Sequence, residues 1–189
     1  MIAGVILAGG QARRMGGGDK TLLMLGGQSL LARIIGRLGP QVDALAINAN
    51  GDPARFKAFG LPVLPDGVPG FPGPLAGVLA GMVWAAGLGA AWLITAPGDA
   101  PFLPLDLAVR LNTGQEYACA SSNGRTHPVA ALWPVADAPR LAAALAAGQR
   151  KIDAFTGPNT AVISWPTTPF DPFLNINTPD DLDQAARLL

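Results

Sequence analysis

In the first half of the chain, short runs of mostly apolar residues alternate with segments in which apolar residues recur at helical spacing. Such runs, unlike strictly alternating ones, are typical of parallel strands covered on both faces of a sheet. The runs that predict strands lie at residues 3–7, 42–47, 61–64 and 91–95. Between them, apolar residues recur at helical spacing over 30–38 behind Ser29, a residue type that caps helices, and a second helix is expected over 74–86.

Strands dominate the second half of the chain. Residues 116–121 and 129–132 predict two strands joined by a polar turn, and 161–165 predicts a further strand. An alanine-rich helix is expected over 137–147. Alternating strands and helices followed by paired strands predict a Rossmann-like three-layer α/β/α sandwich, with a mostly parallel sheet and an antiparallel addition. A length of 189 residues predicts one domain over 1–189.

The first predicted strand runs into a loop of glycine and basic residues between Leu7 and Lys20. The loop holds five glycines, two arginines and an Asp-Lys pair. Glycine lets the backbone approach a ligand closely, and successive N–H groups can form an anion-binding concavity. The loop therefore predicts a polyphosphate site, the alternative being a surface loop without a ligand. Because Asp19 precedes Lys20, it is not a Walker A loop, and it lacks the G-x-G-x-x-G dinucleotide fingerprint.

Three polar residues stand at or just beyond the ends of other predicted strands: Asn48, Asp66 and Asp99. Ligands of α/β sheets bind beyond the carboxyl ends of the strands. The carboxamide of Asn48 suits a nucleobase edge, and a turn role is equally expected. A carboxylate beyond a central strand suits Mg²⁺, which predicts a metal ligand at Asp99. A helix N-cap is the alternative there, although Asp106 is the better candidate for capping that helix.

The second half offers fewer candidates. His127 is the only histidine, and it is expected either to contact a substrate or to be a solvated strand end. Asn175 and Asn177 are predicted on one face of a strand, where they could hold a phosphate or a metal-bound water. Thr178 is predicted to cap the last helix. The basic corner at 148–151 fits an anionic substrate or a solvated helix C-terminus equally well.

Composition narrows the class of protein. The net charge is zero and only 14% of residues are charged, which argues against binding to nucleic acid or to a membrane surface by long-range charge. Cys119 is the single cysteine, so internal disulfides and cysteine metal clusters are excluded. The uncharged stretch between Asp66 and Asp99 is interrupted by prolines and glycines, which favours a loop, a helix and a strand over a membrane span. A cytoplasmic location is expected, because the N-terminus lacks the pattern of a signal peptide.

Three motifs resemble those of the molybdenum cofactor guanylyltransferases, members of the nucleotidyltransferase superfamily. The opening loop matches L-A-G-G-x-x-x-R-M-G-G-x-D-K at every fixed position. The chain also contains the family's G-P-L-A-G stretch at 73–77 and matches F-x-N-x-N-T-P-x-D-L at 173–182. The family usually has Asp-Thr-Pro where this chain has Asp99-Ala100-Pro101, so any contact from that hydroxyl is lost.

The resemblance implies the nucleotidyltransferase fold and transfer of GMP from Mg-GTP to the terminal phosphate of molybdopterin, with release of pyrophosphate. It implies a nucleotide site made by Leu7, Ala8, Gly9, Lys20, Asn48, Asp66 and Asp99. Lys20 and Arg14 would neutralise phosphate charge and Asp99 would bind Mg²⁺, which makes these three the catalytic residues. His127 would face the acceptor substrate.

The chemistry implied by the family does not need a general base, because a phosphate monoester with a second pKa of about 6 is already largely ionised at neutral pH. Consistent with this, the sequence pattern predicts no Ser/His/Asp or Cys/His catalytic set. The expected partners are GTP and molybdopterin, with molybdenum-insertion and client molybdoenzyme proteins as further partners, and the expected state is a monomer. Two rival interpretations remain: a cytidylyltransferase or sugar-phosphate nucleotidyltransferase using another nucleotide, and a nucleotide-binding module without turnover.

Overall fold

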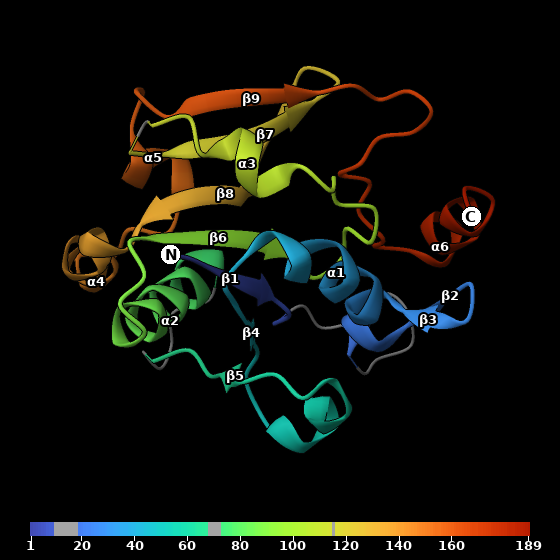
Figure 1. The fold of residues 1–189 in the computed structure, drawn as a ribbon, viewed down its shortest axis with the longest axis horizontal. Coiled ribbons are helices and arrows are strands. Elements are labelled where there is room, and N and C mark those ends of the chain that lie inside the picture. Colours follow the sequence, from blue (N-terminus) through green and yellow to red (C-terminus); the bar gives the residue numbers. More distant parts are fainter. Residues whose placement is uncertain (10–18, 68–72, 115) are drawn as a thin grey trace.

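The computed structural model describes residues 1–9, 19–67, 73–114 and 116–189. Its centre is a seven-stranded sheet in the order β5-β4-β1-β6-β8-β7-β9 (Figure 1). Its strands are β1 (Ile2–Leu7), β4 (Ala44–Asn48), β5 (Val63–Leu64), β6 (Trp92–Pro97), β7 (Ala118–Ser122), β8 (Arg125–Pro134) and β9 (Ala161–Trp165). A separate two-stranded hairpin pairs β2 (Met24–Leu25) with β3 (Gln28–Ser29).

The sheet is mostly parallel, as predicted. β5, β4, β1 and β6 pair in parallel, and β9 is parallel to β7. β8 is antiparallel to both β6 and β7, which is the predicted antiparallel addition. Because of this direction, the first residues of β8 lie at the same edge of the sheet as the last residues of its neighbours.

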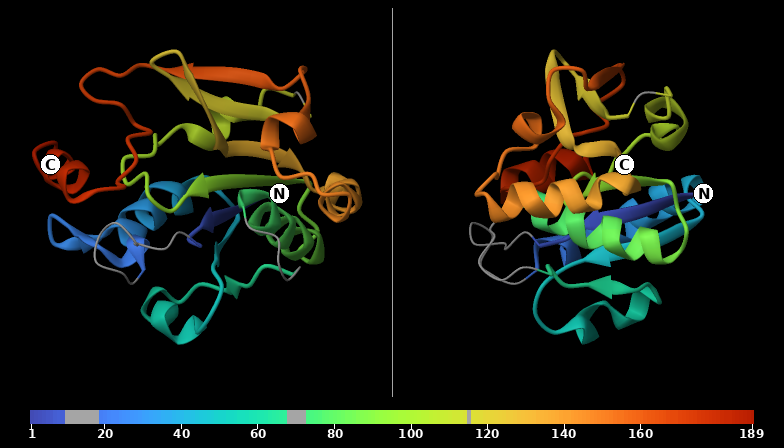
Figure 2. Two further views of the ribbon diagram at one scale, coloured as in Figure 1. Left: turned by 180° about the vertical axis from the view of Figure 1, so that it is seen from behind. Right: turned by 90° about the vertical axis from the view of Figure 1, so that its left-hand side faces the viewer.

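Helices cover both faces of the sheet and make it the middle of three layers (Figure 2). They are α1 (Leu30–Leu38), α2 (Pro74–Gly87), α3 (Leu107–Leu111), α4 (Ala138–Ala146), α5 (Ile152–Thr156) and α6 (Pro179–Ala186). Shorter 3-10 helices span Lys20–Leu22, Gly39–Gln41, Pro53–Phe59 and Val135–Asp137. The core on one face contains residues of α1 and α3, and the core on the other contains residues of α2, α4 and α5.

The uncharged stretch between Asp66 and Asp99 supplies α2 and β6 rather than a membrane span. α2 is apolar along most of its length, and it packs on the sheet with α4 beside it. None of the helices in the described ranges is both long enough and apolar enough to cross a bilayer.

A third, smaller core brings the end of the chain back to its beginning. Leu25 of β2 and Leu30 of α1 pack with Phe102, Ile176 and Ala185. As a result α6 lies beside the β2–β3 hairpin, although the two are at opposite ends of the sequence (Figure 1). This packing places the segment before α6 next to Lys20.

Two local expectations differ from the structure. The polar turn is shorter than predicted, because Asn123 and Gly124 adopt positive φ of 48° and 71° and let β7 and β8 extend to it. The segment around Asn175 and Asn177 is not a strand: it crosses the end of β6, where Ile176 N donates to Asp99 O over 2.9 Å.

Candidate functional site

An open cleft of about 880 Å³ lies where the parallel strands β1, β4, β5 and β6 end. Residues predicted for a nucleotide site that line the cleft are Leu7, Gly9, Lys20, Asn48, Asp66 and Asp99. Ala8 is buried behind them, and its N–H donates to Asn48 O over 2.8 Å. His127 and Asn175 also line the cleft. Arg14 lies outside the described residues.

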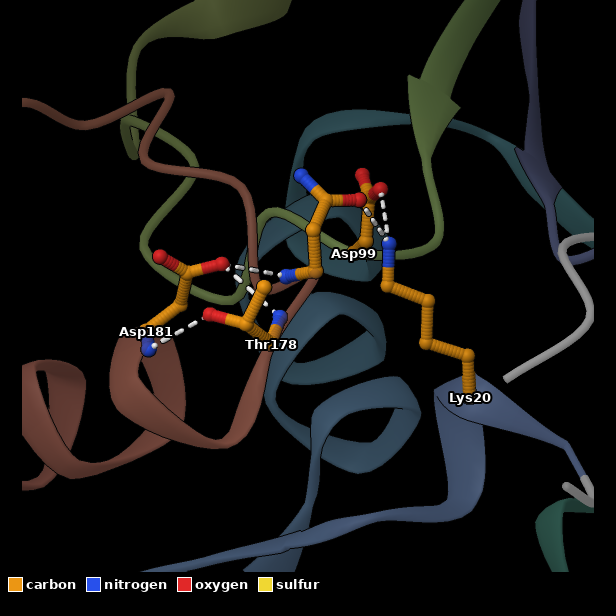
Figure 3. Close-up of polar contacts among 5 residues, drawn as sticks. Lys20, Asp99, Thr178 and Asp181 are labelled. Atoms are coloured by element: carbon orange, nitrogen blue, oxygen red, sulfur yellow. Dashed lines mark hydrogen bonds and ion pairs between the residues drawn. The ribbon is translucent and has the colours of Figure 1, made fainter. Parts of the chain in front are cut away.

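Lys20 is held at the cleft wall by two partners from distant parts of the chain (Figure 3). Its Nζ donates to Asp99 Oδ2 over 2.7 Å and to Asn177 Oδ1 over 2.5 Å. The Lys20 side chain is only 11% exposed and that of Asp99 24%, so this ion pair is less screened by water than a surface pair. An ammonium group has three N–H donors, which leaves one of them for a ligand in the cleft.

Asn177 owes its position to the start of α6, where Figure 3 labels Thr178 and Asp181. The N–H groups of Asn177 and Thr178 both donate to Asp181 Oδ2 over 2.8 Å, and Asp181 N donates to Thr178 Oγ1 over 3.2 Å. This is a capping box with Thr178 as the N-cap, as predicted. The backbone N–H of Asn177 is the main cause that lowers the pKa of Asp181. Asn177 therefore positions Lys20, whereas the sequence pattern predicted that it would hold a phosphate or water directly.

A second polar cluster lies at the ends of β4 and β5. Asn48 Nδ2 donates to Leu64 O over 3.0 Å and to Asp66 Oδ1 over 2.9 Å. Asn50 donates from Nδ2 to Asp66 Oδ2 over 2.7 Å and accepts from Asp66 N over 2.8 Å. The carboxylate of Asp66 is thus fixed between two asparagines at the cleft wall. The sequence pattern did not single out Asn50 as a partner of Asp66.

Asp19, the residue before Lys20, pairs with Arg55 on the 3-10 helix Pro53–Phe59 rather than with Lys20. The Arg55 guanidinium also donates to Asp52 O over 2.6 Å and to Asn50 O over 2.5 Å. One guanidinium thus connects Asp19 to Asn50, which holds Asp66. The sequence pattern gave no sign that Arg55 pairs with Asp19.

Thr21 is a cleft residue that sequence reasoning missed. It is 2% exposed, and its Oγ1 is buried without a hydrogen-bond partner among the described residues. Its methyl group packs so closely against Gly98 that a Cβ at position 98 would stand 2.7 Å from Thr21 Cγ2. A buried hydroxyl without a partner is unfavourable in the free protein, which marks Thr21 as a potential ligand contact.

His127 belongs to a cluster that the sequence pattern did not predict. Its Nε2 lies 2.7 Å from Ser122 Oγ, and Ser122 Oγ donates to the carboxylate of Asp171 at 2.8 and 3.0 Å. The serine lies between the histidine and the aspartate and is 1% exposed. In a hydrolytic triad the histidine lies in the middle and the serine faces the substrate, so the arrangement is not that of a nucleophile.

The surroundings of His127 favour the neutral ring. Burial lowers the pKa of His127, with Asp171 opposing and Arg125 adding to this shift. The imidazole stacks on Phe173 at 4.6 Å between ring centroids and 21° between planes. Phe173 in turn is fixed through its N–H, which donates to Asp171 Oδ1 over 2.9 Å.

The donor set at the cleft fits a magnesium ion that travels with a nucleotide. Mg²⁺ typically takes one or two protein carboxylates and completes its shell with water and substrate phosphates. Asp99 supplies a carboxylate at the cleft, and Asn175 an exposed carboxamide. Among the described residues there is no group of three or more His, Cys, Asp or Glu side chains close enough to hold a metal on their own. The residues therefore suit a shared ion better than a protein-only metal centre.

The prediction that Asp106 caps α3 is wrong, and one residue of the basic corner contacts a helix end. Asp106 is the residue before α3, but its side chain makes no capping hydrogen bond and instead accepts from Trp165 Nε1 over 2.8 Å. At the basic corner, Arg150 donates to Leu145 O over 3.0 Å and to Gln149 O over 2.8 Å. The guanidinium thus binds a carbonyl of the last turn of α4, which is the helix-terminus alternative.

Comparison with known proteins gives a match that agrees with the motifs. Residues 4–160 match the MobA-like NTP transferase domain. A molybdenum cofactor guanylyltransferase of Rhodopseudomonas palustris (strain BisB5) is 56% identical over 193 residues, covering 97% of this chain and 92% of that protein.

Solved structures share the fold at lower identity. Molybdopterin-guanine dinucleotide biosynthesis protein A from Archaeoglobus fulgidus superposes with a TM-score of 0.73 at 24% identity, covering 98% of this chain and 97% of that one. The 4-diphosphocytidyl-2C-methyl-D-erythritolsynthase of Anaerococcus prevotii superposes with a TM-score of 0.76 at 11% identity, covering 100% and 95%. At these identities the superpositions establish the nucleotidyltransferase fold alone.

Proposed function

The chain belongs to the MobA-like NTP transferase family, and from this premise we propose that it transfers GMP from GTP to the terminal phosphate of molybdopterin. The product is molybdopterin guanine dinucleotide, and pyrophosphate is released. The structural observation that carries the proposal is the Lys20–Asp99–Asn177 group, which shares one cleft with the Asn48–Asp66 pair. GTP needs a cation to bind its phosphates and polar groups to bind its nucleoside, and the cleft offers both.

The reaction requires charge neutralisation and alignment more than proton transfer. A phosphate oxygen of molybdopterin attacks the α-phosphorus of GTP, and the bond from that phosphorus to the bridging oxygen of the β-phosphate breaks. The electron pair of this bond leaves with pyrophosphate. The remaining N–H donor of Lys20 is available to a phosphate oxygen during this step, and its fixed position avoids reorganisation as charge moves. Arg14 would add a second cation to the same site.

At the other end of the cleft, Asn48 and Asp66 would bind the nucleoside. Asp66 accepts from both asparagines, so its carboxylate is held in place before any ligand arrives. A fixed carboxylate suits the N–H donors of a guanine edge or the hydroxyls of a ribose. Backbone groups of Leu7, Ala8 and Gly9 would lie along the nucleotide.

Asp99, with Asn175 nearby in the cleft wall, would hold Mg²⁺ together with the phosphates of GTP. When bound, the ion would neutralise the charge of the triphosphate and orient the leaving pyrophosphate. Lys20 pairs with the same carboxylate in the cleft wall. We also propose that the protein works as a monomer in the cytoplasm, which size-exclusion chromatography with light scattering would test for the oligomeric state.

The deciding experiment measures pyrophosphate release from purified protein mixed with Mg²⁺, molybdopterin and either GTP or CTP. Release that needs molybdopterin and strongly prefers GTP is expected. A preference for CTP would support a cytidylyltransferase instead. Binding of GTP without pyrophosphate release under any of these conditions would support a nucleotide-binding module without turnover and would overturn the proposal.

A further inference from the structure

The Ser122–His127–Asp171 cluster connects three segments at the cleft. Ser122 is the last residue of β7, His127 is in the first part of β8, and Asp171 lies in the connection that leads to α6. Ser122 is buried, whereas His127 is half-buried and lines the cleft. The cluster therefore runs from the protein interior to the substrate site.

The proton of the Ser122 hydroxyl determines how the histidine is protonated. Both oxygens of the Asp171 carboxylate lie near Ser122 Oγ, at 2.8 and 3.0 Å. A carboxylate can only accept, so the single hydroxyl proton of Ser122 points to Asp171. The contact of 2.7 Å between Ser122 Oγ and His127 Nε2 then needs its proton from the ring, because the hydroxyl has no second one to give.

This leaves the other ring nitrogen of His127 as a hydrogen-bond acceptor. A neutral imidazole that carries its proton on Nε2 presents a lone pair on Nδ1. Nδ1 has no hydrogen-bond partner among the described residues, and it is not among their buried unpaired atoms. It is therefore open to solvent on a residue of the cleft wall. The stacking on Phe173 fixes the plane of the ring.

We propose that Ser122 and Asp171 hold His127 in its Nε2–H form, so that Nδ1 accepts a hydrogen bond from an N–H group of the substrate's heterocycle. That this heterocycle is the pterin of the acceptor substrate rests on the proposed function. The assignment of the tautomer does not. Ser122 and Asp171 are positioning residues, and His127 is the residue that contacts the ligand. This assignment differs from an imidazolium that binds phosphate, which would require both nitrogens to donate.

The charges that face the ring agree with this form. Asp171 lies beyond Ser122 and favours an imidazolium, while Arg125, on the same strand, and burial oppose it, with burial the largest effect. The net direction is towards a neutral ring, and Ser122 then decides which nitrogen keeps the proton.

The first test uses the fact that the chain has one histidine. Nitrogen-15 NMR of imidazole-labelled protein at neutral pH reports the protonation of Nδ1 and Nε2 separately. The expected spectrum has a protonated Nε2 and an unprotonated Nδ1 in the wild type, and a mixture of both tautomers in Ser122→Ala. A predominant Nδ1–H form, or an unchanged tautomer in both Ser122→Ala and Asp171→Asn, would overturn the proposal.

The second test uses steady-state kinetics to distinguish a contact with molybdopterin from a general structural effect of the substitution. Loss of one hydrogen bond in Ser122→Ala or His127→Gln should raise KM for molybdopterin by about 2- to 12-fold, with KM for GTP unchanged. His127→Asn, which can place its carboxamide oxygen near the position of Nδ1, should recover part of this loss. Equal changes in both KM values would contradict the assignment.

The matched control is Ser121→Ala. Its hydroxyl donates to Ile163 O over 3.3 Å, away from the cluster, and it should keep both KM values and the NMR spectrum of the wild type. If the wild type transfers no GMP at all, the proposed function fails, yet the NMR experiment still decides the tautomer. The two failures are therefore distinguishable.

Discussion

The carboxamide of Asn48 occupies space that only a glycine at position 77 leaves open. A Cβ at Gly77, in the first turns of α2, would stand 2.2 Å from Asn48 Oδ1 and 2.8 Å from its Cγ. Because Asn48 is buried and bonded to Leu64 and Asp66, it cannot move aside without breaking these hydrogen bonds. The G-P-L-A-G motif at 73–77 therefore contributes to the candidate nucleoside site through an absent side chain.

Gly77→Ala should accordingly weaken GTP binding. The displaced Asn48 would release Asp66, and we expect at least a 10-fold loss in affinity by titration calorimetry, with a loss of about 1–3 kcal/mol in the free energy of unfolding from overpacking. The control is Gly36→Ala in α1, where a Cβ would meet nothing within 4 Å. That change should leave GTP binding intact and stabilise the helix by up to about 1 kcal/mol. Equal affinity in both variants would refute the role of Gly77.

Lys20→Ala should lose most of the turnover while the protein stays folded. Removal of one preorganised donor to developing charge costs roughly 10²- to 10³-fold in kcat, and the variant also leaves Asp99 without its cation. Asp99→Ala should cause a loss of similar size. Pyrophosphate release is the readout, circular dichroism reports folding, and exposed Lys57 offers the control Lys57→Ala. Wild-type turnover in Lys20→Ala would remove Lys20 from the mechanism.

Thr21→Val should stabilise the free protein and weaken GTP binding. The hydroxyl of Thr21 is buried without a partner among the described residues, so a methyl group in its place removes an unfavourable polar atom. The comparison is Thr95→Val, whose hydroxyl donates to Val129 O over 2.5 Å and accepts from Trp133 Nε1 over 2.9 Å. That variant should lose about 1–3 kcal/mol in urea denaturation. If Thr21→Val binds GTP as tightly as the wild type, the hydroxyl does not contact the ligand.

The residue types of the site were predictable, because polar residues after apolar runs mark strand ends that share one edge of a parallel sheet. Asn48, Asp66 and Asp99 were found in this way, and the glycine-rich motif identified Lys20. The contacts between them were not predictable. Lys20 and Asn177 are 157 residues apart, and only the packing of α6 against β2 and α1 brings them together.

Partners that lack a local pattern were missed for the same reason. Ser122 and Asp171 are 49 residues apart, and neither stands in a motif that a single sequence can distinguish from a turn. The pairing of Asp19 with Arg55 depends on where the 3-10 helix Pro53–Phe59 lies relative to Asp19. Long-range pairs of this kind follow from tertiary packing, which periodicity does not encode.

The Asp19–Arg55 pair should couple Asp19 and its neighbour Lys20 to Asn50 and Asp66. Asp19→Asn and Arg55→Gln are each expected to weaken GTP binding, and the double variant should be no weaker than the worse single one, because each change breaks the same contact. A double-mutant cycle on calorimetric affinities measures this coupling. Fully additive losses would mean that the two residues act independently, and unchanged affinity in Asp19→Asn would leave Asp19 as scaffolding of the loop.

Asp181→Ala should lower both the stability of the protein near neutral pH and its turnover. The pKa of Asp181 is lowered in the folded protein by the N–H groups of Asn177 and Thr178. A carboxyl with a lowered folded pKa contributes stability above its unfolded value of 3.8, and loses it as pH falls through the folded pKa. The variant should therefore be less stable than the wild type near neutral pH, by about 0.3–1 kcal/mol for a lost carboxylate in the first helical turn, and the difference should shrink below pH 3.8.

Urea denaturation between neutral and acidic pH measures this difference directly, and Asp183→Ala, an exposed position of the same helix, is the control. Because Asp181 also fixes Asn177, which in turn binds Lys20, the variant should lose turnover at neutral pH while it is still folded. A stability difference that stays constant down to the lowest pH would mean that the carboxylate charge does not contribute. Turnover equal to that of Asp183→Ala would mean that Lys20 keeps its position without the capping box.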